Sequence, residues 1–253
     1  MTMPVDYTVE GRIARLTLNS PHNHNALSTA LVEQLHQGFA DAAAADVRAV
    51  VLGHTGPTFC AGADLSEAAG RDPGDVAVDR AREMTRLLRT ILELPVPVIA
   101  AVDGHVRAGG MGLVAACDIA VAGPASTFAL TEARIGVAPS IISLTLLPKL
   151  TARAAGRYFV TGERFGPAEA AQIGLITAAA DDVAAMVADL TASIAKASPQ
   201  GLATSKALTT ASVLAGFDER AEVLTEQSAR LFVSEEAHEG MLAFLQKRRP
   251  SWI

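Results

Sequence analysis

VPVIAAVDGHVRAGGMGLVAACD, residues 96–118, places three glycines within four positions after an apolar run. The β-branched run is typical of a buried strand, and a helix is predicted after the glycines. Glycine builds no core and costs backbone entropy, so Gly109, Gly110 and Gly112 need a reason beyond packing. A glycine turn from strand to helix presents N–H groups at the positive end of the helix dipole, which stabilises an anion.

Strands and helices also alternate on either side of this stretch. A hairpin is predicted around Gly11, and the run at 47–54 predicts a buried strand. Ser28 is a predicted N-cap, and a further helix is predicted over 78–92, after a turn-rich segment at 70–75. This alternation predicts an α/β core in the first two-thirds of the chain.

The last third of the chain is expected to be mostly helical. Pro199 predicts a break, with three amphipathic helices after it. We therefore divide the chain into a core at 1–197 and a helical oligomerisation region at 198–253. The apolar residues that this region is expected to bury against another subunit include Val213, Leu214 and Phe217.

Composition excludes several classes of protein. Of the 253 residues, 50% are hydrophobic and 19% charged, which is typical of a folded globular chain. The net charge of −6 predicts no nucleic-acid partner. No secretory signal is visible, and no apolar stretch approaches the ~18 residues of a membrane span. Two cysteines form no disulfide framework, so we expect a cytoplasmic protein that binds no membrane.

A second loop of small residues, FCAGADL at 59–65, also follows a predicted buried strand. Two such loops, each at the end of a strand, can bring their free N–H groups together. The later stretch STFALTEARIGVAP at 126–139 adds one carboxylate, Glu132, to an apolar run. Two N–H donors would stabilise an enolate or a similar oxyanion, and the carboxylate would move a proton beside it.

Other interpretations of the glycine cluster remain open. Gly110, Gly112 and Ala115 match a dinucleotide-binding fingerprint, with Glu132 about 20 residues further on. Four residues, 105–108, separate that match from its strand, which disfavours it. The simplest alternative is a tight structural turn.

Several individual residues near these loops also have structural interpretations. Cys60 has no identifiable activating histidine, so a small buried side chain is preferred to a nucleophile. His22 and His24 are expected to serve a loop, so no metal site is predicted. Arg107 could touch the substrate or pair with a neighbouring carboxylate, and the pairing is preferred. Asp64 is expected to tie the backbone of its own loop.

Four ordered motifs resemble those of the crotonase superfamily, the enoyl-CoA hydratase/isomerase family. They are NSPHNHNALS, FCAGADL, GGMGL followed by CDI, and the C-terminal GMLAFLQKRRPSW. The resemblance covers nearly the whole chain. It implies a spiral of ββα units with C-terminal helices that form a trimer or a dimer of trimers. It also implies an acyl-CoA thioester as substrate, with no separate cofactor because coenzyme A belongs to the substrate.

The resemblance also implies the site residues. The oxyanion donors are the N–H groups of Ala63 and Gly109, and Glu132 is the acid/base group. The residues implied to contact the substrate are Cys60, Ala61, Asp64, Leu65, Gly110 and Lys247, the last at a coenzyme A phosphate.

One departure from the family pattern affects the function. Hydratases of the family commonly carry a second glutamate where this chain has Gly112. The leading interpretation is a hydratase that adds water to a 2-enoyl-CoA. A Δ3,Δ2-enoyl-CoA isomerase with Glu132 as its single base, and a non-catalytic acyl-CoA-binding protein, remain alternatives. If the pocket has room, Gly112→Glu is expected to raise hydratase activity.

Overall fold

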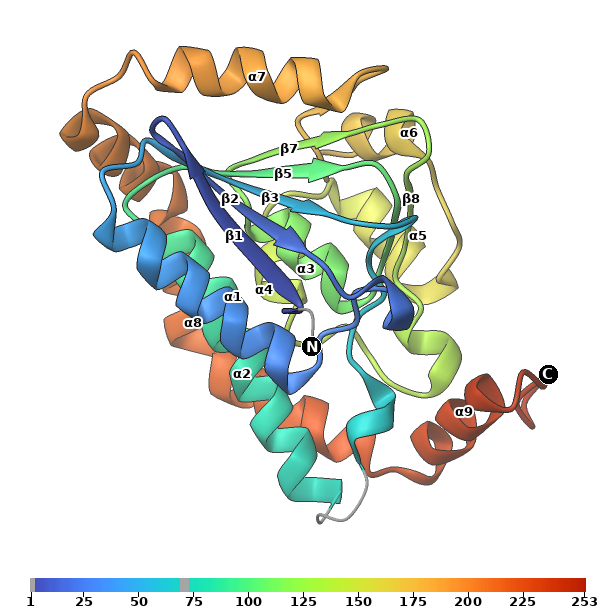
Figure 1. Ribbon diagram of the computed structural model, residues 1–253. Helices are drawn as coiled ribbons and strands as arrows, with labels where there is room; N and C mark the ends of the chain where they lie inside the picture. The colour runs from blue at the N-terminus through green and yellow to red at the C-terminus, as the bar shows by residue number, and fades with distance from the viewer. Residues whose placement is uncertain (1–2, 69–72) are drawn as a thin grey trace.

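The computed structural model describes residues 3–68 and 73–253 (Figure 1). Over these residues, one sheet has six strands in the order β1-β2-β3-β5-β7-β9. The first two strands form the predicted antiparallel hairpin, and the other neighbours pair in parallel. The strands are β1 (Val5–Glu10), β2 (Ile13–Leu18), β3 (Ala49–His54), β5 (Val98–Val102), β7 (Ile119–Ala122) and β9 (Ala178–Ala179).

A smaller parallel sheet consists of β4 (Thr58–Cys60), β6 (His105–Arg107) and β8 (Thr127–Ala129), in that order. Each of its strands follows the end of β3, β5 or β7, and Figure 1 shows β8 turned across the ends of β5 and β7. A helical segment then leads to the next strand pair. This repeat confirms the predicted spiral of ββα units.

The first two long helices follow the predictions closely. Helix α1 (Thr29–Ala44) begins at the predicted N-cap, where the Ser28 side chain accepts a hydrogen bond from the N–H of Leu31. Helix α2 (Pro73–Glu93) begins five residues before the predicted start at Val78. The turn expected at 70–75 lies partly outside the described residues, and its last three residues are helical.

The C-terminal region differs from the prediction. Two helices, not three, follow residue 198 within the described chain: α8 (Pro199–Phe232) and α9 (Glu235–Leu245). N-caps at Ser198 and Ser234 mark the two starts, and no proline interrupts the 34 residues of α8. The other helical segments are η1 (Pro21–Asn23), η2 (Leu65–Ala68), α3 (Gly109–Ala116), η3 (Glu132–Ile135), α4 (Ser143–Leu146), α5 (Ala152–Thr161), α6 (Pro167–Gln172) and α7 (Val183–Ile194).

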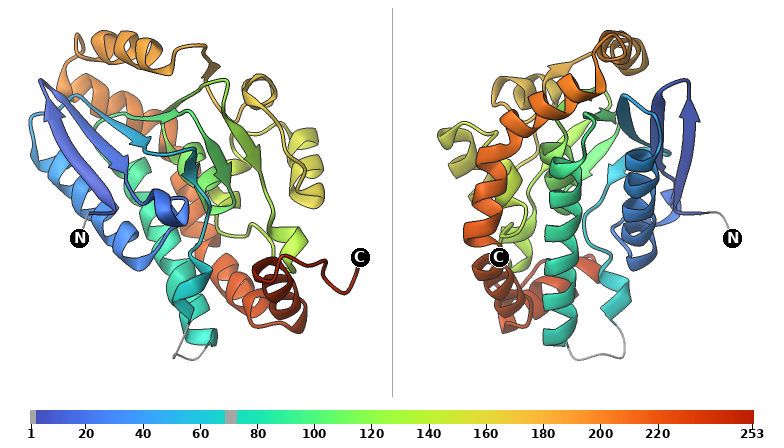
Figure 2. Two further views of the ribbon diagram at one scale, coloured as in Figure 1. Left: turned by 45° about the vertical axis from the view of Figure 1, so that its right-hand side comes forward. Right: turned by 90° about the vertical axis from the view of Figure 1, so that its left-hand side faces the viewer.

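The larger sheet lies between two apolar layers, because strand side chains alternate between its faces. Val51 and its neighbours on β5 and β7 pack on α7, which covers one face (Figure 2). Val50 and Leu52 point to the other face, into the main core. That core includes residues of α1, α2, α3 and α8.

Helix α8 is packed into its own subunit, against α2. Val213 and Phe217, which the sequence suggested would need another subunit, are 8% and 1% exposed and belong to the main core. The ammonium group of Lys206 donates to the Asp118 carboxylate at 2.8 Å. It also donates to the carbonyls of Ile91 and Val96, at 2.7 and 3.0 Å. None of the described helices is long and apolar enough to cross a bilayer.

Candidate active site

Two loops meet where β4 and β6 end. Gly62 has φ +92°, and a Cβ there would lie 2.8 Å from the Ala108 Cβ and 3.3 Å from the Gly109 nitrogen. Only glycine permits this approach of the two backbones. The N–H of Leu27 donates to the Gly62 carbonyl at 2.7 Å and holds the first loop in place.

The second loop enters α3 through an unusual residue, Ala108, with φ 46° and ψ −120°. A non-glycine residue at positive φ is uncommon and is typical of functional sites. Gly109 is the first residue of α3, so its N–H has no partner within the helix. Across the described residues, neither this N–H nor that of Ala63 donates to a protein acceptor.

A cavity of about 1760 Å³ includes Ala63 and Gly109 in its wall. This is larger than the roughly 300–1,000 Å³ of ordinary small-molecule pockets and suits a long ligand. Ala61, Asp64 and Leu65 also line it, as expected. Residues of α1, α2 and α9 complete the wall.

Glu132, the carboxylate predicted as the acid/base group, lines the same cavity. Glu132 begins the single-turn helix η3 after β8 and is only 8% exposed. Burial raises its pKa to about 7, although the backbone N–H groups of Glu132 and Thr131 favour the charged form. Its Oε2 is buried and without a hydrogen-bond partner in the described chain. Such a group suits proton transfer near neutral pH.

The position of the missing second glutamate is filled by apolar groups. A Cβ on Gly112 would lie 2.4 Å from the Ile142 Cγ2 and 3.2 Å from the Met84 Cε. Gly112→Glu was expected to raise hydratase activity only if the pocket had room for the new side chain, and this space is already occupied. Sequence reasoning did not identify Ile142 and Met84, because they come from distant elements and carry no chemical motif.

Two of the residues expected to contact substrate lie behind the cavity wall. Cys60 is fully buried, and burial raises the pKa of its thiol to about 12, as expected for a structural side chain. Gly110 packs against it: a Cβ there would lie 2.8 Å from the Cys60 Cβ. Neither residue is among those that line the cavity, and both support the two loops, so their role as substrate contacts stays a prediction that this placement does not favour.

Asp64 ties its own loop, as predicted. One carboxylate oxygen accepts from the N–H and the hydroxyl of Ser66, at 3.0 and 2.6 Å. The other oxygen accepts from the Asn23 amide at 3.1 Å. These bonds fix the chain just after Ala63.

The preferred interpretation of Arg107, pairing with a carboxylate, is wrong. Its guanidinium donates to the carbonyls of Val106 and Thr127 and to the Thr127 hydroxyl, at 2.6–2.8 Å, and among the described residues it pairs with no carboxylate. Arg107 is half-buried and lines the cavity. Lys247 is exposed and lies outside the cavity of its own chain, whereas Arg248 lines it.

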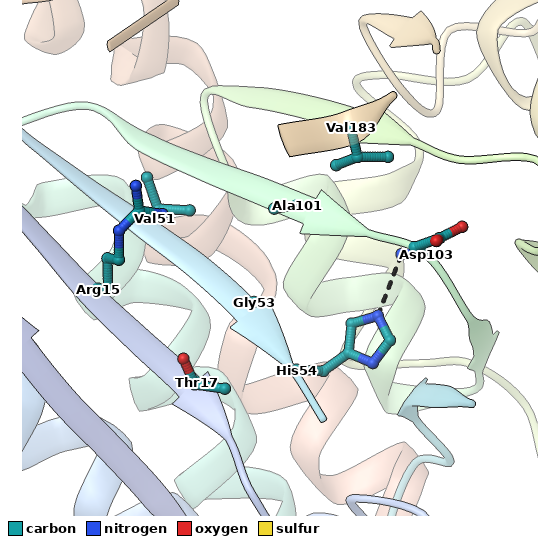
Figure 3. A pocket seen from close by; sticks show the side chains of 8 residues that line it. All are labelled: Arg15, Thr17, Val51, Gly53, His54, Ala101, Asp103 and Val183. Carbon is teal, nitrogen blue, oxygen red and sulfur yellow. Dashed lines mark hydrogen bonds between the residues drawn. The ribbon is translucent and has the colours of Figure 1, made fainter. Parts of the chain in front are cut away.

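A second hollow, of about 220 Å³, lies on the larger sheet beneath α7 (Figure 3). The Asp103 N–H donates to Nε2 of His54 there, at 3.0 Å. This hollow shares no residue with the large cavity. The grouped N–H donors and Glu132 therefore mark the large cavity as the candidate active site.

Comparisons with known proteins identify the family of the chain. The profile of the family described as Enoyl-CoA hydratase/isomerase matches residues 8–253. The chain therefore belongs to the enoyl-CoA hydratase/isomerase family.

Relatives within the family share nearly the full length. A crystal structure of an enoyl-CoA hydratase from Mycobacterium avium is 65% identical, covers 100% of both chains and has a TM-score of 0.94. A structure from Mycobacterium avium paratuberculosis is 67% identical over 98% of each chain, also with a TM-score of 0.94. The 2,3-dehydroadipyl-CoA hydratase of Escherichia coli is 32% identical and covers 95% of each chain.

Proposed function

We propose that this protein is an enoyl-CoA hydratase, a lyase that adds water across the double bond of a 2-enoyl-CoA thioester. The observation that carries the proposal is that Ala63 and Gly109, whose N–H groups have no acceptor among the described residues, line one cavity together with Glu132. The 65% identical hydratase from Mycobacterium avium supports it. Hydration and enolate stabilisation are the chemistry that this set of groups can perform.

In the proposed reaction, Glu132 acts alone. Its carboxylate takes a proton from water as the water oxygen bonds to C3 of the substrate. The electron pair of the double bond moves toward the thioester oxygen, and the enolate that forms accepts hydrogen bonds from Ala63 and Gly109. Glu132 then returns the proton to C2, so no second acid is required.

One observation favours a second candidate function. Position 112 carries no carboxylate, and Ile142 and Met84 occupy the space beside it. Glu132 is therefore the single buried carboxylate among the residues described at the site. One base is sufficient to move a proton between C2 and C4, which is the reaction of a Δ3,Δ2-enoyl-CoA isomerase.

Separate incubations with 2-enoyl-CoA and 3-enoyl-CoA thioesters distinguish these functions. Hydration adds the mass of one water to the 2-enoyl substrate, whereas isomerisation leaves the mass unchanged and moves the double bond. We expect hydration of the 2-enoyl thioester. Conversion of the 3-enoyl thioester alone would favour the isomerase, and binding without a product would favour a non-catalytic acyl-CoA-binding protein. The cytoplasmic location stays a prediction.

A further inference from the structure

Helix α9 touches η3, the turn that carries Glu132, backbone to backbone. A Cβ on Gly240 of α9 would lie 2.5 Å from both the carbonyl carbon and the carbonyl oxygen of Ile135. On the other side of the contact, a Cβ on Gly136 would lie 2.5 Å from the Glu236 carbonyl carbon. Each glycine thus lies against the other segment's main chain, where no side chain fits.

The backbone at this contact is directly connected to Glu132. Ile135 is the last residue of the single turn that Glu132 begins. The N–H groups of Gly136 and Val137 both bond to the Glu132 carbonyl, the second at 3.1 Å. A shift of Ile135 therefore moves the main chain of Glu132.

Helix α9 packs on little else in its own chain. None of its residues belongs to the main core cluster of the described chain, and Figure 1 shows it at the edge of the molecule, away from the larger sheet. Its buried face is made of small residues, with Ala237 fully buried and Ala243 1% exposed. Phe244, in contrast, is 64% exposed. The close fit to η3 is thus the main contact that the fold gives this helix.

We propose that α9 is a positioning element for Glu132, and that the seating of Gly240 on Ile135 fixes the depth of the Glu132 carboxylate in the cavity. The inference rests on the proposed function, in which Glu132 moves the proton. Gly240 lines the same cavity but has no side chain to present to the reacting atoms, so its proposed effect on Glu132 passes through the turn.

Gly240→Ala tests this directly. Alanine is the better helix former, so the substitution favours α9 as a helix and disturbs only its contact. Misplacing a reacting group by about 1 Å can cost on the order of 100-fold in rate. We expect kcat for enoyl-CoA hydration to fall at least about tenfold, with a smaller change in KM. The matched control is Gly156→Ala in α5, where a Cβ meets nothing within 4 Å, and its kcat should equal that of wild type.

A double-mutant cycle separates positioning from general damage. If α9 acts through Glu132, Gly240→Ala lowers kcat in the wild-type background but costs nothing further in a Glu132→Gln background. An equal loss in both backgrounds, or no loss in either, would overturn the inference. Ala237→Gly adds no atoms and loosens the same face of α9. It should also reduce kcat, and it takes the place of Gly240→Ala if that variant does not fold.

The same experiment keeps the two proposals apart. A wild-type protein that neither hydrates nor isomerises any enoyl-CoA would refute the proposed function. If the wild type is active but the kcat losses of Gly240→Ala and Glu132→Gln multiply in the double variant, only the positioning role of α9 is refuted.

Discussion

At the scale of single residues, the site depends on one buried carboxylate. We expect Glu132→Gln to lower the hydration rate by about 10²–10⁴-fold, because general acid–base help of that size is lost while the shape is kept. Binding of a saturated acyl-CoA should persist, because in the proposed site the thioester accepts hydrogen bonds from the backbone N–H groups of Ala63 and Gly109, which the substitution leaves in place. Initial rates and calorimetric titration measure the two effects. Wild-type turnover in this variant would show that another residue moves the proton.

The pKa of Glu132 also predicts how activity depends on pH. Burial raises that pKa to about 7, and the proposed mechanism starts from the ionised carboxylate. The hydration rate should therefore be high above pH 7 and fall as the pH drops through the pKa and the carboxylate takes up a proton. A profile of kcat/KM against pH, which reports the pKa values of the free enzyme, checks this. The residual activity of Glu132→Gln should lack the same limb.

Gly112 gives the third prediction at this scale. Because Ile142 occupies the space beside it, Gly112→Glu should overpack the site and destabilise the protein by about 1–3 kcal/mol. It should not raise hydration. Urea unfolding and initial rates measure both quantities, and Gly112→Glu combined with Ile142→Ala is the control that provides room. A faster single variant would contradict the packing described here.

At this scale, the sequence predicted which residues would line one cavity, whereas their catalytic roles stay predictions. Small residues at Ala63 and Gly109, and a lone Glu132, stand in short motifs that predict their own conformation. The apolar filling at Gly112 and the contact of Gly240 with Ile135 were not predictable. Both depend on segments that only tertiary packing brings together.

At the scale of elements, α8 is attached to the body of the protein through a buried ion pair. Lys206 is 5% exposed and bonds to the Asp118 carboxylate. Removing one partner of a buried pair leaves an uncompensated charge, which costs about 3–5 kcal/mol. We expect Lys206→Met to lower the free energy of unfolding by that amount in urea titrations. Lys206→Met with Asp118→Asn should recover part of the loss, and equal losses in the two variants would contradict a paired charge.

The sequence predicted element types better than element ends. Strand positions followed from runs of β-branched residues, and Ser28 and Pro199 marked two helix starts. The number of C-terminal helices was wrong because amphipathic spacing does not show where one helix ends. Ser234, the cap that begins α9, was the useful signal, since α8 contains no proline after its first residue.

At the scale of the whole molecule, we expect a trimer or a dimer of trimers. The apolar side chains that the sequence suggested for the interface do not form it, because Val213 and Phe217 of α8 are buried within the subunit. Other large apolar side chains remain exposed in the C-terminal region, and an oligomer interface would cover such groups. They are Leu208, Val223, Val233, Leu242, Phe244, Leu245, Trp252 and Ile253. Light scattering at micromolar concentration measures the assembly, and a stable monomer would refute the expectation.

The small sheet has a further consequence for how such an enzyme can diverge. Ala63, Gly109 and Glu132 follow β4, β6 and β8, three strands that lie side by side. Neighbouring strands are held about 4.8 Å apart by their hydrogen bonds, so the sheet fixes the spacing of the groups that follow its strands. Loops and helices elsewhere in the spiral can then change length, and with them the acyl chains accommodated, without altering the spacing of the groups that we propose to hold the thioester.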